Sequence, residues 1–145
     1  MNPVGSIEVL TGSHSHGQGH ETTFAQIVAE RFGIPVENVS IVHGDTDKVQ
    51  FGMGTYGSRS TPVAGAAIAM AARKIHAKAK KIAAHLMEVS EADLEWEIDR
   101  FKVRGDDAKY KTMTQIAWAA YNSPPPGLEP GLEAVPYYDP PNFNF

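Results

Sequence analysis

The stretch Gly12-Ser-His-Ser-His-Gly-Gln-Gly-His-Glu-Thr-Thr23 is followed later in the chain by a second glycine-rich stretch, Gly52-Met-Gly-Thr-Tyr-Gly-Ser-Arg-Ser-Thr61. Each stretch lies between a strand-like segment and a helix-like segment. A helix N-terminus offers unpaired backbone N–H groups and a partial positive charge, so a glycine-rich loop at that place suits an anion. The two stretches therefore predict strand–loop–helix units that carry a site for an anionic cofactor.

The segments around the first loop predict a strand, a helix and a second strand. Residues 7–10 form a short apolar run that ends at the loop, and residues 39–43 form another such run. Between them, Gly33 stands where the C-terminal stop of a helix is expected. Apolar residues recur at helical spacing before that glycine: Phe24, Ile27, Val28 and Phe32.

A long helix is predicted after the second loop. Ser60-Thr61-Pro62 combines a hydroxyl cap with a proline in the first turn, and the helix is expected to continue to about Met87. Residues 64–72 are nearly all small, which predicts that this half of the helix is buried on several sides. One face carries an apolar stripe made of Ile68, Ala72, Ile75, Ala79, Ile82 and Leu86.

The following segment predicts two strands and a last helix. Apolar residues alternate along it, and they are Leu94, Trp96, Ile98, Phe101 and Val103. This alternation predicts two strands joined by a tight turn at Asp99-Arg100. Thr112 and Gln115 have the spacing of a capping box, which predicts a short helix to about Tyr121. The predicted fold class is α+β, with a mixed small sheet and two loop-to-helix units.

The last part of the chain differs in composition. We expect residues 1–122 to form the domain and residues 123–145 to form a proline-rich tail or linker, because most of the 10 prolines lie in the tail. The tail is nevertheless too apolar for a freely solvated segment. Either it packs back on the domain or its partner is missing. Its apolar residues are Leu128, Leu132, Val135, Tyr137, Tyr138, Phe143 and Phe145.

Composition excludes several classes of protein. The formal net charge is -4 and the isoelectric point is about 5.8, which argues against nucleic acid as a partner. The absence of cysteine excludes disulfides, thiolate metal sites and cysteine nucleophiles. The sequence shows no export signal and no apolar run long enough to span a bilayer, so we expect a cytoplasmic protein without a membrane span.

The histidines of the first loop suggest a metal site, but their spacing does not support one. His14, His16 and His20 lie close together, and imidazole is a common zinc ligand. A zincin motif, however, needs a second histidine four positions after His20, where this chain has Phe24. We therefore favour histidines that donate hydrogen bonds or are solvated. Neither a serine nucleophile elbow nor a standard dinucleotide or Walker motif is present.

The two loops do offer donors for phosphate. Thr55, Ser58, Arg59 and Ser60 supply hydroxyl and guanidinium donors next to a predicted helix start. The Gln18 amide both donates and accepts, which suits the edge of a heterocycle. By composition alone, an alternative is equally open: the glycines only permit tight turns, and the arginine pairs with a nearby aspartate, Asp45 or Asp47.

Four stretches resemble one enzyme family in their order and spacing. They are residues 11–22, 42–46, 54–62 and, as a continuation, 89–96. Together they look like the large subunit of aerobic carbon monoxide dehydrogenases, within the molybdenum hydroxylases that include xanthine dehydrogenase and aldehyde oxidase. The resemblance covers essentially the whole chain and is weaker after about Gly105.

This resemblance implies a molybdenum cofactor domain that holds the dinucleotide form of molybdopterin, commonly with cytosine. Carried over by position, Gln18, Gly19 and His20 would lie by the pterin and the molybdenum ligands. A second group would cradle the pyrophosphate and nucleotide: Thr55, Tyr56, Gly57, Ser58, Arg59 and Ser60. The resemblance assigns no catalytic residue and no metal ligand to this chain.

The chain also departs from the family. The family's large subunit is several times longer, its copper-bearing cysteine has no counterpart, and its glutamate-bearing glycine-rich motif is absent. The resemblance therefore implies a fragment or a single-domain relative, inactive and without cofactor in isolation. Its partners would be the remainder of the large subunit and the iron–sulfur and flavin subunits.

The expected reaction is oxidation of carbon monoxide or a related small substrate by water, with an aldehyde or a purine-like heterocycle left open as the substrate. Apolar surface exposed on such a fragment predicts self-association. The alternative function is a stand-alone nucleotide- or phosphate-binding module, or an assembly module, without redox activity.

Overall fold

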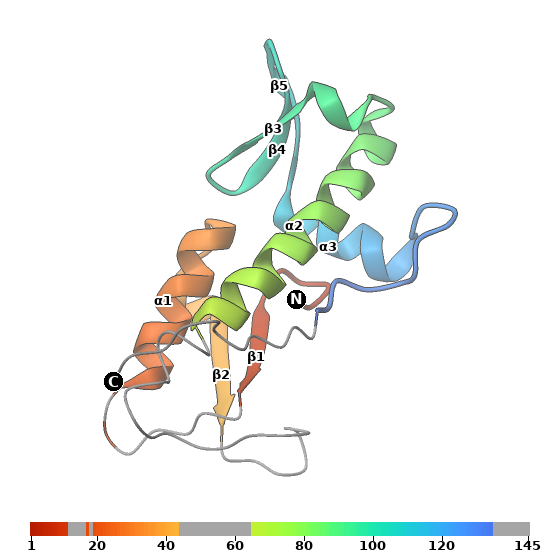
Figure 1. Cartoon of the computed structure of the whole chain (residues 1–145). Coiled ribbons are helices and arrows are strands. Elements are labelled where there is room, and N and C mark those ends of the chain that lie inside the picture. Colours follow the sequence, from red (N-terminus) through yellow and green to blue (C-terminus); the bar gives the residue numbers. More distant parts are fainter. Residues whose placement is uncertain (12–16, 18, 44–64, 135–145) are drawn as a thin grey trace.

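The computed structural model describes residues 1–11, 17, 19–43 and 65–134 (Figure 1). Helices and strands are mixed, which confirms the predicted α+β class. Two short 3₁₀ helices, Val36–Asn38 and Glu91–Asp93, precede strands. The other elements are β1 (Ile7–Thr11), α1 (His20–Phe32), β2 (Val39–His43), α2 (Gly65–Met87), β3 (Leu94–Glu97), β4 (Arg100–Val103), β5 (Asp106–Thr112) and α3 (Met113–Asn122).

The first unit is a parallel strand pair joined by a helix. β1 and β2 pair in parallel, with a register that runs from Ile7 opposite Val39 to Thr11 opposite His43. Parallel neighbours need a long crossover connection, and α1 supplies it. The helix ends at Gly33, whose left-handed backbone lets its N–H group bond the Ala29 carbonyl. These three elements confirm the sequence prediction, with β1 one residue longer.

Helix α2 crosses the middle of the molecule, with α1 and α3 packed against it (Figure 1). The predicted apolar stripe is confirmed, because its residues are buried from Ile68 through Ile82 and only Leu86 is partly exposed. The small residues from 65 to 72 are buried or half-buried, as expected for an end that is covered on several sides. The predicted start at residues 60–62 lies outside the described residues.

A three-stranded antiparallel sheet, β3-β4-β5, forms a hairpin unit at one end of the molecule. The predicted turn at Asp99-Arg100 is wrong by one position, because Ile98 is the turn residue, with φ of 54° and 75% of its surface exposed. The alternating pattern was misleading because this exposed isoleucine mimics a strand position. Strand β5 was missed because its polar sequence, largely exposed, shows no alternation.

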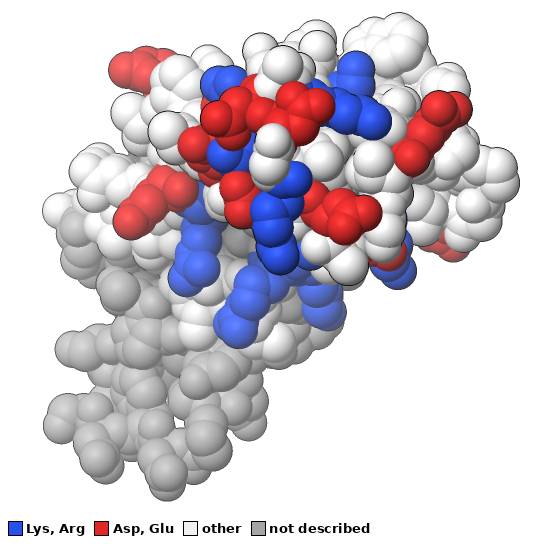
Figure 2. Space-filling view, turned by 90° about the horizontal axis from the view of Figure 1, so that it is seen from above, with Lys and Arg blue, Asp and Glu red and all other residues white. Residues whose placement is uncertain are grey.

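Within the described residues, the strands form two small sheets, one parallel and one antiparallel. Charged side chains of both signs lie side by side on the hairpin unit, which faces the viewer in Figure 2. Lys102 contacts three carboxylates there, Glu95 at 3.2 Å, Glu97 at 3.6 Å and Asp107 at 2.7 Å. Exposed ion pairs of this kind add little stability, so the hairpin unit is held mainly by its packing on the helices.

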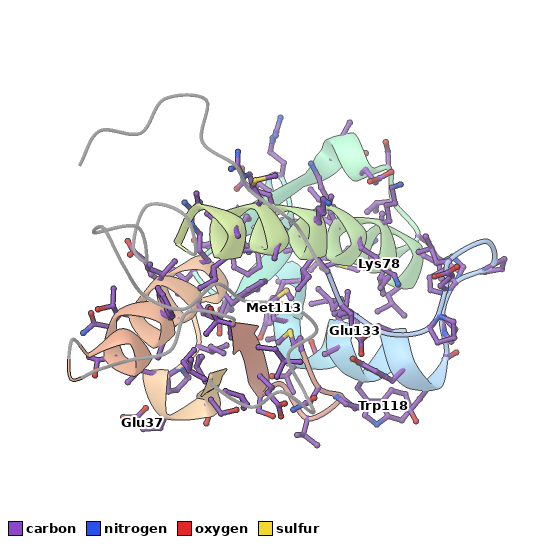
Figure 3. All side chains as sticks on the ribbon, turned by 60° about the horizontal axis from the view of Figure 1, so that its bottom comes forward. Glu37, Lys78, Met113, Trp118 and Glu133 are labelled. Atoms are coloured by element: carbon purple, nitrogen blue, oxygen red, sulfur yellow. The ribbon has the colours of Figure 1, made fainter. Side chains whose placement is uncertain are left out.

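The last helix and the segment after it close the core. The capping box at Thr112 and Gln115 is confirmed, with both reciprocal hydrogen bonds present. Residues 123–134 pack back on the domain, because Leu132 is fully buried and the Gly131 N–H donates to the Ala120 carbonyl at 2.8 Å. Figure 3 shows Lys78 on the side of α2 that faces this segment. Residues 135–145 lie outside the described part of the chain.

One hydrophobic core joins the three helices, strands β1 to β4 and the segment after α3. Burying a large apolar side chain stabilises the fold by about 1.5–3 kcal/mol, so a few residues dominate the balance. Met113 lies inside, between α2 and α3, whereas Trp118 points away at the edge and is 58% exposed (Figure 3). The largest fully buried side chains are Phe24, Phe32, Ile82, Leu94, Met113, Ile116 and Leu132. No described helix is long and apolar enough to cross a membrane.

An aromatic cluster ties α1, α2 and the hairpin unit together. The His76 ring stacks on Phe32 with centroids 4.8 Å apart and meets Trp96 edge-on at 4.4 Å. Its Nε2–H group donates to the Arg31 carbonyl at 2.7 Å. Burial lowers the pKa of His76 below its ordinary value of 6.5; the Arg31 charge acts in the same direction, while the hydrogen bond opposes it. Folding therefore favours the neutral form of the His76 imidazole.

The first prediction compares two glycines with positive φ. Alanine at Gly33 or Gly105 would be strained by about 1 kcal/mol, because both positions are left-handed. At Gly33 a Cβ would also collide with the Ile98 carbonyl, whereas at Gly105 it would meet no described atom within 4 Å. In chemical denaturation, Gly33→Ala should therefore lose about 1–3 kcal/mol more free energy of unfolding than Gly105→Ala. Equal losses would contradict this packing.

The second prediction concerns pH. Because the unfolded chain binds the His76 proton more readily, the free energy of unfolding should be highest above pH 6.5 and fall as the pH drops below 6.5. Denaturation between about pH 7.5 and about pH 5.5 measures this loss. His76→Phe should reduce the loss. His85→Gln, at an exposed position on the same helix, should leave it unchanged, and an unaltered loss in His76→Phe would refute the assignment.

Candidate cofactor-binding site

The candidate site lies where the parallel strands end and α1 begins. Thr11 and His43 are paired at the ends of β1 and β2, so both strands stop at the same edge. The loop of residues 12–19 leads from that edge to the first turn of α1. In open α/β units, ligands bind outside the carboxyl ends of parallel strands, next to helix N-termini.

The first turn of α1 is built to receive a ligand through its backbone. Gly19 occupies the N-cap position with φ of 77° and ψ of 34°, and no side chain caps the helix. The first bond of the helix runs from the Thr23 N–H to the Gly19 carbonyl at 3.0 Å. The backbone N–H groups of the first turn, before Thr23, have no carbonyl partner within the helix, because the residues four positions earlier precede the helix.

Two glycines shape the approach to this turn. Gly17 and Gly19 have φ of 103° and 77°, a region that other residues rarely adopt. A Cβ added at either position would meet no described atom within 4 Å. Among the described residues, the glycines thus serve backbone direction rather than close packing. This arrangement fits a phosphate or a heterocycle edge that is bound by backbone N–H groups.

The structure brings together only part of the predicted site. Gly19 lies at the helix start, and the backbone of His20 opens α1. Gln18 and residues 55–60 lie outside the described residues, so their roles stay predictions. The chain is described again from Gly65, which packs beside Ile27 of α1. Gly17 was not among the predicted residues, although the Gly17-Gln-Gly19 spacing could have identified it.

The histidines show no metal centre in the part of the chain that the structure describes. No group of three or more histidine, aspartate or glutamate side chains is close enough there to hold an ion. His14 and His16 lie outside that part. His76 is half-buried in the aromatic cluster, and His85 is exposed.

A sequence profile of the molybdopterin cofactor-binding domain matches residues 1–145. The chain belongs to the molybdopterin cofactor-binding domain family. Membership agrees with the glycine-led helix start and confirms, at the level of the family, the resemblance drawn from the motifs. The ligand class that fits this domain is a molybdopterin cofactor, which carries molybdenum.

Three relatives are similar to this chain over nearly its whole length. The carbon monoxide dehydrogenase large chain of Hydrogenophaga pseudoflava is 65% identical over 145 residues, which are 100% of this chain and 18% of the relative. The reconstituted CO dehydrogenase from Oligotropha carboxidovorans superimposes with a TM-score of 0.95 at 63% identity, covering 98% of this chain and 18% of that one.

The third relative is quinoline 2-oxidoreductase from Pseudomonas putida 86, with a TM-score of 0.84 and 39% identity, covering 97% of this chain and 18% of that one. The chain therefore spans 18% of the length of each of these three relatives. The shared fold is a cofactor-binding segment common to enzymes with different substrates.

The third prediction tests the left-handed N-cap. Gly19→Ala should destabilise the chain by about 1 kcal/mol, because alanine resists a φ of 77°. Gly19→Asn should cost less, because asparagine tolerates that region and can cap the helix. Chemical denaturation of the two variants measures the difference. Equal costs would mean that the backbone conformation is not what Gly19 provides.

Proposed function

We propose that this chain forms part of the molybdopterin cytosine dinucleotide cradle in the large subunit of a molybdenum hydroxylase that oxidises carbon monoxide or a related small substrate. The observation that carries the proposal is the start of α1. This helix is led by glycines, has no side-chain cap and lies at the shared edge of β1 and β2. It occurs in a chain that is 65% identical to a carbon monoxide dehydrogenase large chain.

Within this proposal the two loops hold different parts of the cofactor. Gln18, Gly19 and His20 lie by the pterin and the molybdenum ligands, with backbone N–H groups as the main donors. The second loop cradles the pyrophosphate and nucleotide through Thr55, Tyr56, Gly57, Ser58, Arg59 and Ser60. Hydroxyl and guanidinium donors suit phosphate oxygens because charge-assisted hydrogen bonds are the strong ones.

When bound, the cofactor supplies the redox chemistry that oxidises the substrate, and the oxygen atom added to the substrate derives from water. The residues of this chain bind and orient it, and none of them is assigned a catalytic role. The remainder of the large subunit and the iron–sulfur and flavin subunits are the proposed partners. Without them, we expect the isolated chain to be inactive, to lack the cofactor and to self-associate.

Carbon monoxide is the favoured substrate because this chain has a higher sequence identity with carbon monoxide dehydrogenase than with quinoline 2-oxidoreductase. It is 65% for the carbon monoxide dehydrogenase large chain, against 39% for quinoline 2-oxidoreductase. The fold itself does not separate these substrates, since both structures superimpose closely on this chain. Sequence identity, rather than the shared architecture, therefore supports the substrate.

The fourth prediction uses the whole large subunit, purified with its partner subunits. It should contain molybdenum, release cytidine monophosphate on acid hydrolysis, and reduce a dye when carbon monoxide is added. Arg59→Ala should weaken cofactor retention by about 10- to 100-fold, the equivalent of one charge-assisted hydrogen bond. Molybdenum content and released nucleotide are the measurements.

Arg104→Ala is the matched control, because Arg104 lies on the hairpin unit and is 66% exposed. This variant should keep its full content of molybdenum and nucleotide. Guanine or adenine nucleotide in place of cytidine would exclude the proposed dinucleotide. A complex without molybdenum would exclude the proposed enzyme class and would favour a binding or assembly module.

A further inference from the structure

A cavity lies away from the candidate cofactor site. It has a volume of about 710 Å³ and opens between the end of α1, the middle of α2 and the hairpin unit. Arg31, at the end of α1, lines it, whereas Gly19 lies at the opposite end of that helix. At a rise of about 1.5 Å per residue, the two positions are roughly 18 Å apart along the axis. Gly19, which the structure describes at the candidate cofactor site, is not among the residues that line the cavity.

The floor of this cavity is aromatic and fixed in place. His76, Trp96 and Phe101 line it, and their rings pack edge to face. Trp96 and Phe101 have centroids 5.0 Å apart, and Phe32 stacks behind His76. Rings held in this way present a preformed apolar surface, so a flat ligand would not have to order them on binding.

The rim of the cavity is cationic. Arg31, Arg73 and Lys80 line it, with Glu30 as the single carboxylate. No ion pair among the described residues involves the side chains of these three cations, in contrast to Lys102 on the hairpin unit. This local excess of positive charge occurs in a chain of net charge -4. A group of Lys and Arg side chains is visible below the mixed charges of the hairpin unit in Figure 2.

We propose that this cavity binds a small organic anion in which a flat aromatic or heteroaromatic ring carries a carboxylate or a phosphate. The ring lies on the floor against Trp96 and His76, which are half-buried, and the anion meets Arg73 and Lys80 at the rim. The volume falls within the range of about 300–1,000 Å³ that is usual for sites of small molecules. An inorganic anion alone would leave the aromatic floor uncovered, and a neutral ring would leave the cations unpaired.

The proposal is independent of the cofactor assignment, because it uses different residues at the other end of α1. Its chemistry is recognition only, with no covalent step. Arg73 and Lys80 lie seven residues apart on α2, which puts them two turns apart on one face of the helix. Two cations along one face can hold an anion at the rim while the ring lies on the floor.

The fifth prediction follows the indole N–H signals of the two tryptophans by NMR in the purified chain. Only Trp96 lines the cavity, so the exposed Trp118 is an internal control. The probes are 2-naphthoate and adenosine monophosphate, with 2-naphthalenemethanol and inorganic phosphate as partial ligands. At least one ring-bearing anion should shift the Trp96 signal saturably. Its affinity should be about tenfold or more higher than that of either partial ligand.

Variants separate the rim from the fold. The double variant Arg73→Ala and Lys80→Ala should weaken binding about tenfold or more, while Arg104→Ala should leave it unchanged. Dispersed amide signals in the variant spectra show that each is folded. The signal of Trp96 reports on the end of α1 opposite Gly19, so failure of the cofactor proposal would not be mistaken for failure of this one.

The two ring-bearing probes identify the source of the anion. A response to 2-naphthoate assigns an aromatic carboxylate, a response to adenosine monophosphate assigns a nucleotide phosphate, and a response to both supports the shared chemistry. No Trp96 shift with either probe overturns the proposal. Equal binding of inorganic phosphate also overturns it, because the ring would then contribute nothing to binding.

Discussion

Burial of one face of α2 is the constraint on which the rest of the structure depends. The helix presents an apolar stripe from Ile68 to Met87, and three other units cover it. α1 packs on one part, α3 on another, and the hairpin unit reaches the helix through β5. Burial of many apolar side chains along one helix gives more stability than any single hydrogen bond in this fold. The positions of α1, α3 and the hairpin unit are therefore set relative to α2.

The candidate cofactor site depends on this packing through α1. The N-terminal turn of α1 lies at the edge of β1 and β2, while its C-terminal end is held against the hairpin unit. Gly33 contacts the turn at Ile98, and the Arg31 carbonyl accepts a hydrogen bond from His76. A helix is stiff, so fixing one end directs the other. Residues distant in sequence from the glycine-rich loops thus orient the helix start that is proposed to hold the cofactor.

The prediction of the fold from sequence succeeded where the signal was local. The Gly33 stop, the capping box at Thr112 and the stripe of α2 were each found, because caps and periodicity act within a few residues. The turn at Ile98 was misplaced because its exposed isoleucine fits the alternation of a strand, and β5 was missed because its polar sequence has no apolar face. Of the candidate site, sequence identified the loop before α1, but not the left-handed conformation of Gly17.

The sequence by itself determined the family, the class of cofactor and the helix start that suits an anion, because these depend on short motifs with a direct chemical meaning. Only the tertiary structure decided that the strands form two sheets and that residues 123–134 pack back on the core. It also placed His76 between Phe32 and Trp96 and gathered cations from two helices around an aromatic floor. Such contacts join residues far apart in the chain, and their free energy comes from burial that no local pattern records.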